Sequence, residues 1–106
     1  MPLNDTNSSN DNDEVIVEDT CNNGGLDNVL TVGTSATEVK VGGSAMSLRK
    51  MVILQALDTG FSYGFSNITQ SFPLYKNQTV MIPAGEDTAI WVVNTASSKS
   101  IAVAEL

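Results

Sequence analysis

The stretch 49–57 constrains the fold more than any other feature of the chain, because apolar residues follow one another in it from Met51 to Leu54 without alternating with polar ones. Val52 and Ile53 within it are β-branched, and the turn-forming residues 58–60 follow it, so the run predicts a strand rather than a helix. Successive side chains of a strand point to opposite sides. A strand that is apolar on both sides is therefore expected at the centre of a sheet, with both of its faces covered.

The rest of the region after residue 25 reads as shorter extended segments separated by turn formers about every eight to twelve residues. Pro73 restricts one of them to a sheet edge, and residues 44–48 are expected to form one helical turn at most. The pattern predicts an all-β protein, a small antiparallel β-sandwich (jelly-roll-like) of about eight short strands, with a barrel as the alternative. The expected strands are 29–32, 37–41, 49–57, 61–65, 72–74, 79–82, 89–93 and 101–104.

Charge divides the chain into two parts. The formal net charge is −7, and seven of the twelve acidic residues lie before residue 28, where there is no Lys or Arg. The remaining five acids balance the five basic residues. We therefore predict an acidic extended arm over residues 1–25 and a neutral β-sandwich domain over residues 26–106.

The arm is poor in large apolar residues, so it is expected to become ordered only against a partner. Within it, a β-prone triplet is fenced by acidic residues, a pattern that suits a strand added to the edge of another subunit's sheet. The alternative is a chance triplet in an unstructured tail. The candidate partner-binding residues are Asp13, Glu14, Val15, Ile16, Val17, Glu18 and Asp19.

The composition points away from catalysis. The chain has no histidine, and its one cysteine, Cys21, lies in the acidic arm, where negative neighbours raise rather than lower a thiol pKa. Glu86 and Asp87 follow a turn and are expected to be solvated rather than to form a glycosidase pair. The oxygen-rich segment 11–14 lacks the glycine and the distal Glu of a calcium loop. No catalytic residue, metal site or cofactor is predicted.

Partner classes are limited by the same composition. Neither part of the chain carries the basic stripe that phosphate binding requires, so no nucleic acid partner is expected. No stretch approaches membrane-spanning length, and the first residues have no basic and apolar signal pattern, so neither a membrane nor a secretory route is expected. The protein is therefore expected to be kept in the cytoplasm or to be assembled there into something larger.

Three aromatic residues, Phe61, Tyr63 and Phe65, alternate with small residues in the strand expected at 61–65. Because small domains need their few aromatic side chains inside, these rings are expected to cap the core. The alternative is a surface aromatic platform that binds a partner or, together with Trp91, a carbohydrate.

Five segments of the chain form a recognisable order: 48–55, 61–65, 72–74, 78–83 and 101–106. This order resembles the small β-sandwich virion proteins of tailed bacteriophages. The resemblance covers residues 29–106, but not the arm, and is a pattern of hydrophobic segments rather than a fingerprint.

The resemblance implies a capsid decoration or cement protein that forms a homo-oligomer and binds the major capsid protein or other virion subunits. It implies no catalytic residues. Three alternatives remain open: a head-to-tail, collar or fibre-base fitting of the virion; a carbohydrate-binding module; and a non-viral adhesion or chaperone-like β domain that exchanges strands through residues 15–17.

Overall fold

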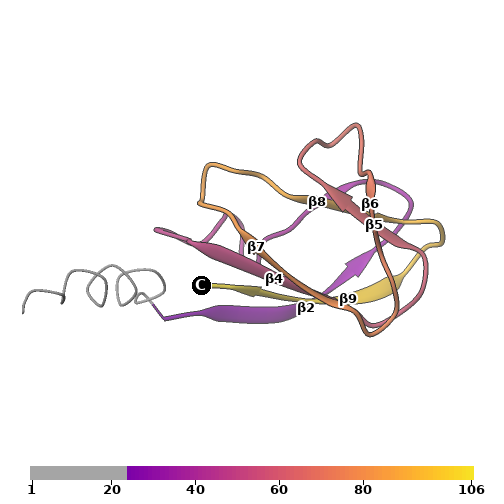
Figure 1. Cartoon of the computed structure of the whole chain (residues 1–106), viewed down its shortest axis with the longest axis horizontal. Coiled ribbons are helices and arrows are strands. Elements are labelled where there is room, and N and C mark those ends of the chain that lie inside the picture. Colours follow the sequence, from indigo (N-terminus) through magenta and orange to yellow (C-terminus); the bar gives the residue numbers. More distant parts are fainter. Residues whose placement is uncertain (1–23) are drawn as a thin grey trace, which may run out of the picture.

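The apolar run forms β4 (Met51–Ala56), an interior strand that pairs with β7 (Thr79–Pro83) on one side and β9 (Lys99–Glu105) on the other. The computed structural model describes residues 24–106, and this part of the chain forms two antiparallel sheets of four strands each (Figure 1). The predicted central position of the run is therefore confirmed.

The first sheet has the strand order β2-β9-β4-β7, and the second has the order β3-β8-β5-β6. Consecutive strands cross from one sheet to the other, except for the hairpin of β5 and β6, which gives the strand order of a jelly roll. The remaining strands are β2 (Leu26–Val32), β3 (Thr37–Glu38), β5 (Phe61–Gly64), β6 (Phe72–Leu74) and β8 (Trp91–Asn94).

The all-β sandwich prediction is confirmed, and no residue of 24–106 is helical. The strand with Pro73 is an edge strand, as the missing N–H requires. The strand expected over 37–41 is shorter, because its backbone leaves the ladder: Val39 N–H still donates to the Ile90 carbonyl at 2.8 Å, but Val41 N–H donates to the Glu105 carboxylate instead. Residues 24–106 contain no helix that is long and apolar enough to cross a membrane.

The core lies between the two sheets and is built from the inward side chains of both. Leu54, Ile101 and Val92 are fully buried there, and strand alternation places them on the facing sides of β4, β9 and β8. The buried apolar residues are Val32, Val39, Val52, Leu54, Ala56, Phe61, Leu74, Ile82, Ala84, Ile90, Val92, Ile101 and Val103.

The expectation that both faces of β4 are covered is wrong for one face. Val52, Leu54 and Ala56 are buried in the core, but Met51, Ile53 and Gln55 on the other face remain partly exposed. No described element packs over this second face, because the sandwich has only two layers. The apolar run therefore supplies more apolar surface than residues 24–106 cover themselves.

Candidate functional site

The outer face of the first sheet is a two-row surface across its four strands. Antiparallel register aligns Val29, Ala102, Gln55 and Thr79 in one row. The next row consists of Asp27, Ala104, Ile53 and Met81. Most of these side chains are apolar although they face outward, and Met81 at the β7 edge is 67% exposed.

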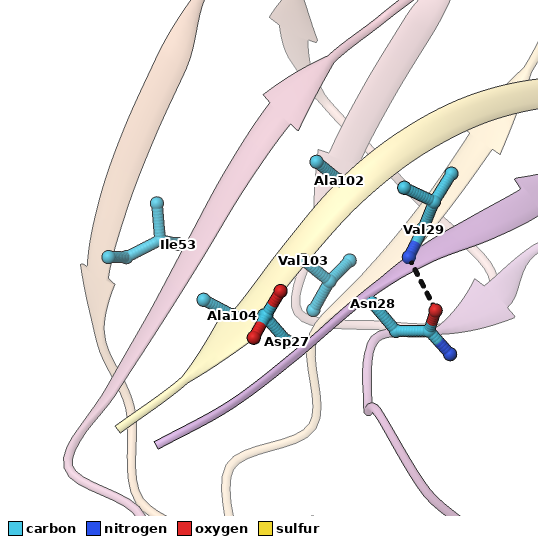
Figure 2. Close-up of a pocket in the computed structure, with 7 residues that line it drawn as sticks. All are labelled: Asp27, Asn28, Val29, Ile53, Ala102, Val103 and Ala104. Carbon is cyan, nitrogen blue, oxygen red and sulfur yellow. Dashed lines mark hydrogen bonds between the residues drawn. The ribbon is translucent and has the colours of Figure 1, made fainter. Parts of the chain in front are cut away.

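A groove runs along this face over β9 (Figure 2). Its floor is low because Ala102 and Ala104 are small, and Val29 from β2 and Ile53 from β4 stand on either side of it. Neighbouring strands lie about 4.8 Å apart, so the two walls are separated by roughly 10 Å, a width that suits one aliphatic side chain. We call this feature the alanine groove; it is lined by Asp27, Asn28, Val29, Ile53, Ala102, Val103 and Ala104.

The alanine groove is nearly free of charge. Asp27 is the one ionisable residue among those that line it. Asn28 is turned to its own backbone, since its Oδ1 accepts the Val29 N–H at 2.8 Å (Figure 2). The groove is thus apolar at its floor and walls, with a single carboxylate at one end.

A second apolar surface lies at the β5–β6 corner of the other sheet. The Tyr63 and Phe72 rings are 5.4 Å apart between centroids, and the Phe65 ring meets Phe72 edge-on at 6.5 Å. Phe65 and Phe72 are each about half exposed, whereas Tyr63 packs partly against the core. These contacts link the start of the β5–β6 loop to the strand that follows it.

The loop between β5 and β6 presents an apolar side chain at its most exposed point. Ile68 is 86% exposed, the highest value of any large apolar residue described. The loop is held by its own hydrogen bonds: Ile68 N–H donates to Ser66 Oγ at 3.0 Å, and Gln70 Nε2 donates to the Ser66 carbonyl at 2.7 Å. A Cβ on Gly64 would lie 2.8 Å from the Thr69 carbonyl oxygen, so the loop packs tightly over that glycine.

The three rings Phe61, Tyr63 and Phe65 do not share one surface. Phe61 is buried in the core, with 3% exposure, which confirms the expected core position for this ring and makes the alternative of a surface platform wrong for it; Tyr63 is intermediate and Phe65 is exposed. The physical reason is position along the sheet: Phe61 faces Leu74 and Asn94 across the interior of the sheet, whereas Phe65 lies beyond the end of β5. Phe72, which was not predicted, joins the cluster instead.

Trp91 lies on the other side of the second sheet from Tyr63. Tyr63 is in register with Val92, which is buried, and Trp91 is adjacent to Val92 in sequence, so its side chain points outward. The carbohydrate platform that combined Trp91 with the three other rings is therefore not formed.

A buried ion pair ties together one end of the sandwich. Arg49 Nη1 donates to Glu105 Oε2 at 2.8 Å, and both side chains are at most 1% exposed. Three more guanidinium N–H groups, one on Nε and two on Nη2, donate to the backbone carbonyls of Ala84, Gly85 and Thr88 at 2.8–3.2 Å. The N–H groups of Arg49 that point toward the loop after β7 therefore hold that loop in place and are not available to a ligand.

Glu105 is equally well satisfied. Its Oε1 accepts the Val41 N–H at 2.8 Å, and its Oε2 accepts the Met46 N–H at 3.1 Å in addition to Arg49. Burial by itself raises the pKa of the Glu105 carboxyl, but these backbone and guanidinium hydrogen bonds outweigh it and hold the pKa below the ordinary value of 4.5. The ion pair therefore holds the β3–β4 connection against β9.

Sequence reasoning missed this ion pair, although one local signal was present. Ile101, Val103 and Glu105 share a strand face by alternation, so Glu105 follows two core residues and had to be buried with a partner. Nothing local identifies Arg49 as that partner, because the two residues are 56 positions apart.

The remaining predicted residues add no site. The proposed partner-binding residues of the arm, Asp13 to Asp19, and Cys21 lie outside the described residues 24–106. Glu86 is exposed, and its Oε1 accepts the Leu48 N–H at 3.0 Å; Asp87 is exposed in the same turn. Within the described part of the chain no group of three or more metal-ligating side chains comes together.

Comparison with known proteins adds no relative: no protein family model, curated protein or solved structure matches the chain. The class of protein is therefore defined by its fold alone, an antiparallel jelly-roll β-sandwich with two uncovered apolar surfaces.

Proposed function

We propose that this chain is a non-enzymatic structural protein of a tailed bacteriophage virion, which decorates the capsid and stabilises it by covering seams between subunits. The observation that carries the proposal is the outer face of β4. Met51 and Ile53 lie on the outer face of an apolar run and remain partly exposed, because no strand or helix of residues 24–106 packs over that face. Exposed apolar surface on a sheet face is typical of contact with another protein chain, and this supports the proposal.

The size of the domain supports the same role. A folded part of about 80 residues buries a limited core, and association with neighbours is a common source of additional stability. Jelly rolls occur in viral capsid proteins and in lectins, so the strand order agrees with a virion role by analogy of fold alone.

The proposed mechanism is mass action on the assembled shell. A protein that binds only the assembled capsid stabilises it against disassembly by an amount that grows with its occupancy. The acidic arm would contact Lys or Arg side chains of the major capsid protein, while the β-domain contacts its neighbours through its apolar surfaces.

The test is the copy number of this chain in purified virions, measured by mass spectrometry against the major capsid protein. Hundreds of copies are expected for a decoration protein. A dozen or fewer would place the chain at a unique vertex, as a head-to-tail, collar or fibre-base fitting, and absence from virions would overturn the proposal.

Deletion of residues 1–25 tests the role of the arm separately. The truncated chain should keep the near-ultraviolet spectrum and cooperative unfolding of the full chain but lose binding to capsids that lack the protein. Full occupancy by the truncated chain would show that the arm does not provide the attachment.

A further inference from the structure

We propose that the chain associates head to tail with a second copy of itself: the β5–β6 loop of one copy, led by Ile68, occupies the alanine groove of the next. This inference deepens the proposed function and rests on it, since it names the chain that covers the outer face of β4. It concerns two surfaces that belong to the same molecule but cannot meet within it.

The loop has the properties of a pre-organised anchor. Ile68 projects from it with 86% exposure, and the two hydrogen bonds to Ser66 hold the loop in place before any partner arrives. The contact between Phe65 and Phe72 braces its base. A rigid loop loses little conformational entropy on binding, so the burial of its apolar side chain contributes more fully to affinity.

The composition around the anchor is that of an interface centre. Residues 59–75 contain no Asp, Glu, Lys or Arg, although this segment includes the exposed loop and an edge strand. Central parts of protein interfaces are depleted in charge and enriched in aromatic residues, with uncharged polar residues around them. The charge-free segment can therefore be buried without desolvating an ion.

The alanine groove has the complementary shape and chemistry. Val29 and Ile53 stand on either side of a floor made by Ala102 and Ala104, which leaves a trough about one aliphatic side chain wide. Asp27 at its end is the one carboxylate of the lining, and the amide of Asn67 and the hydroxyl of Thr69 are donors on the loop that can reach such an acceptor. No cation is required on the partner.

The geometry of the fold makes the contact intermolecular. The loop rises from β5 and β6 at one side of the molecule, whereas β2, β9 and β4 form the sheet at the opposite side (Figure 1). Each copy thus carries the protruding loop on its second sheet and the alanine groove on the outer face of its first sheet. Such a contact joins different patches of the two copies and produces a closed ring or an open chain, not a symmetric face-to-face dimer.

The experiment measures the self-association of the full chain by sedimentation velocity over a wide range of concentration. The wild-type protein is expected to form species larger than a dimer. Ile68→Asp and Ala102→Glu should each weaken association by about thirtyfold or more, the loss typical of a central anchor. Ile68→Ser provides a second variant of the loop in case Ile68→Asp folds poorly.

Two matched controls separate position from charge. Asn77→Asp places a carboxylate in the exposed turn between β6 and β7, outside both the β5–β6 loop and the alanine groove. Ser100→Glu places one on the same strand and the same face as Ala102, but opposite Thr31 and outside the groove. Both controls should associate within a few-fold of the wild type, and all variants should unfold with wild-type cooperativity.

Mixing the two variants gives the decisive result. Ile68→Asp keeps an intact groove and Ala102→Glu keeps an intact loop, so a mixture should form a one-to-one pair and no larger species. A wild-type protein that stays monomeric, or association that survives both substitutions, would overturn the proposal. So would a dimer lost in Ala102→Glu but retained in Ile68→Asp, because that result means pairing of two outer faces.

Failure of this inference is distinguishable from failure of the proposed function. Self-association is measured without capsids, and capsid binding is measured independently by co-sedimentation with purified capsids that lack the protein. A wild-type chain that binds capsids but never self-associates overturns the head-to-tail contact alone. One that self-associates but neither binds capsids nor occurs in virions overturns the virion role alone.

Discussion

Two regions of the molecule reverse the usual distribution of residue types. The Arg49–Glu105 end of the sandwich buries charged residues, whereas the β5–β6 loop exposes apolar ones. At the first, two opposite charges are buried, and they are hydrogen-bonded to each other and to backbone groups of the same chain. At the second, Ile68 and the ring of Phe65 face solvent on a segment that has no charge at all.

The difference separates what stabilises the fold from what is available to a partner. A buried ion pair is stable only if hydrogen bonds satisfy both groups, and Arg49 and Glu105 meet that condition with five further backbone contacts. The half-exposed rings of Phe65 and Phe72 pack together at the base of the loop that carries Ile68, and exposed apolar patches of this kind are typical of surfaces that contact a partner.

The largest expected effect is the loss of one member of the buried ion pair. Arg49→Met leaves the Glu105 carboxylate buried without its cation and leaves three backbone carbonyls without donors, which should lower the free energy of unfolding by about 3–5 kcal/mol. Urea denaturation measures the change. The control is Lys40→Met: the Lys40–Glu38 pair is 3.4 Å long and about one-third exposed, so the loss should be below about 1 kcal/mol. Equal losses in the two variants would contradict the assignment of the ion pair as a structural centre.

Adjacent residues of β4 sharpen the contrast between covered and uncovered faces. Leu54→Ala should lower the free energy of unfolding of the dissociated chain by about 2–5 kcal/mol, because a fully buried side chain leaves a cavity. Ile53→Ala on the outer face should lower it by less than half as much, since no closed cavity results. Denaturation of dilute protein measures both. A loss from Ile53→Ala as large as that from Leu54→Ala would mean that the outer face is covered within the monomer.

The pH dependence of stability tests the Glu105 carboxylate. Its pKa in the folded chain lies below 4.5, so the stability it contributes is fully present above that pH and is lost as the pH falls through the lowered value. The free energy of unfolding should therefore fall less steeply below pH 4.5 in Glu105→Gln than in the wild type. Urea titrations at a series of pH values measure both slopes, with Glu86→Gln as the exposed control. Identical slopes for the wild type and Glu105→Gln would show that the carboxylate does not contribute in this way.

The smallest expected effect on stability is at the loop tip. Ile68→Ser should change the free energy of unfolding by no more than about 0.5 kcal/mol, because the side chain is exposed and makes no core contact. Thermal unfolding of the dilute, dissociated chain provides the measurement. A substantial loss would show that Ile68 supports the fold, and the contrast with the ion pair would then disappear.

Several features of the structure followed from local sequence alone. The β-branched run at residues 52–53 and the turn formers after it predicted an interior strand, and Pro73 placed β6 at an edge. These inferences succeed because alternation and turn chemistry act over a few residues, which a single sequence displays directly. The all-β class and the approximate positions of the strands follow for the same reason.

The candidate site was predicted only in part. Phe65 and Tyr63 were identified as possible surface residues, but Phe61 is buried and Phe72 takes part instead. Exposure at the end of a strand depends on what packs over it, and periodicity does not contain that information. Ile68 and the alanine groove were not identified, since each depends on which segments lie side by side.

The sequence by itself determined the local properties of this protein: strands that alternate, turns that separate them, an acidic stretch before residue 28 and a remainder without net charge. Only the tertiary structure decided how these parts pair, because the register of distant strands depends on contacts between residues far apart in the chain. It joined Arg49 to Glu105 across 56 positions, built a groove from three strands, and left one face of an apolar strand without a cover. The proposed function rests on that face.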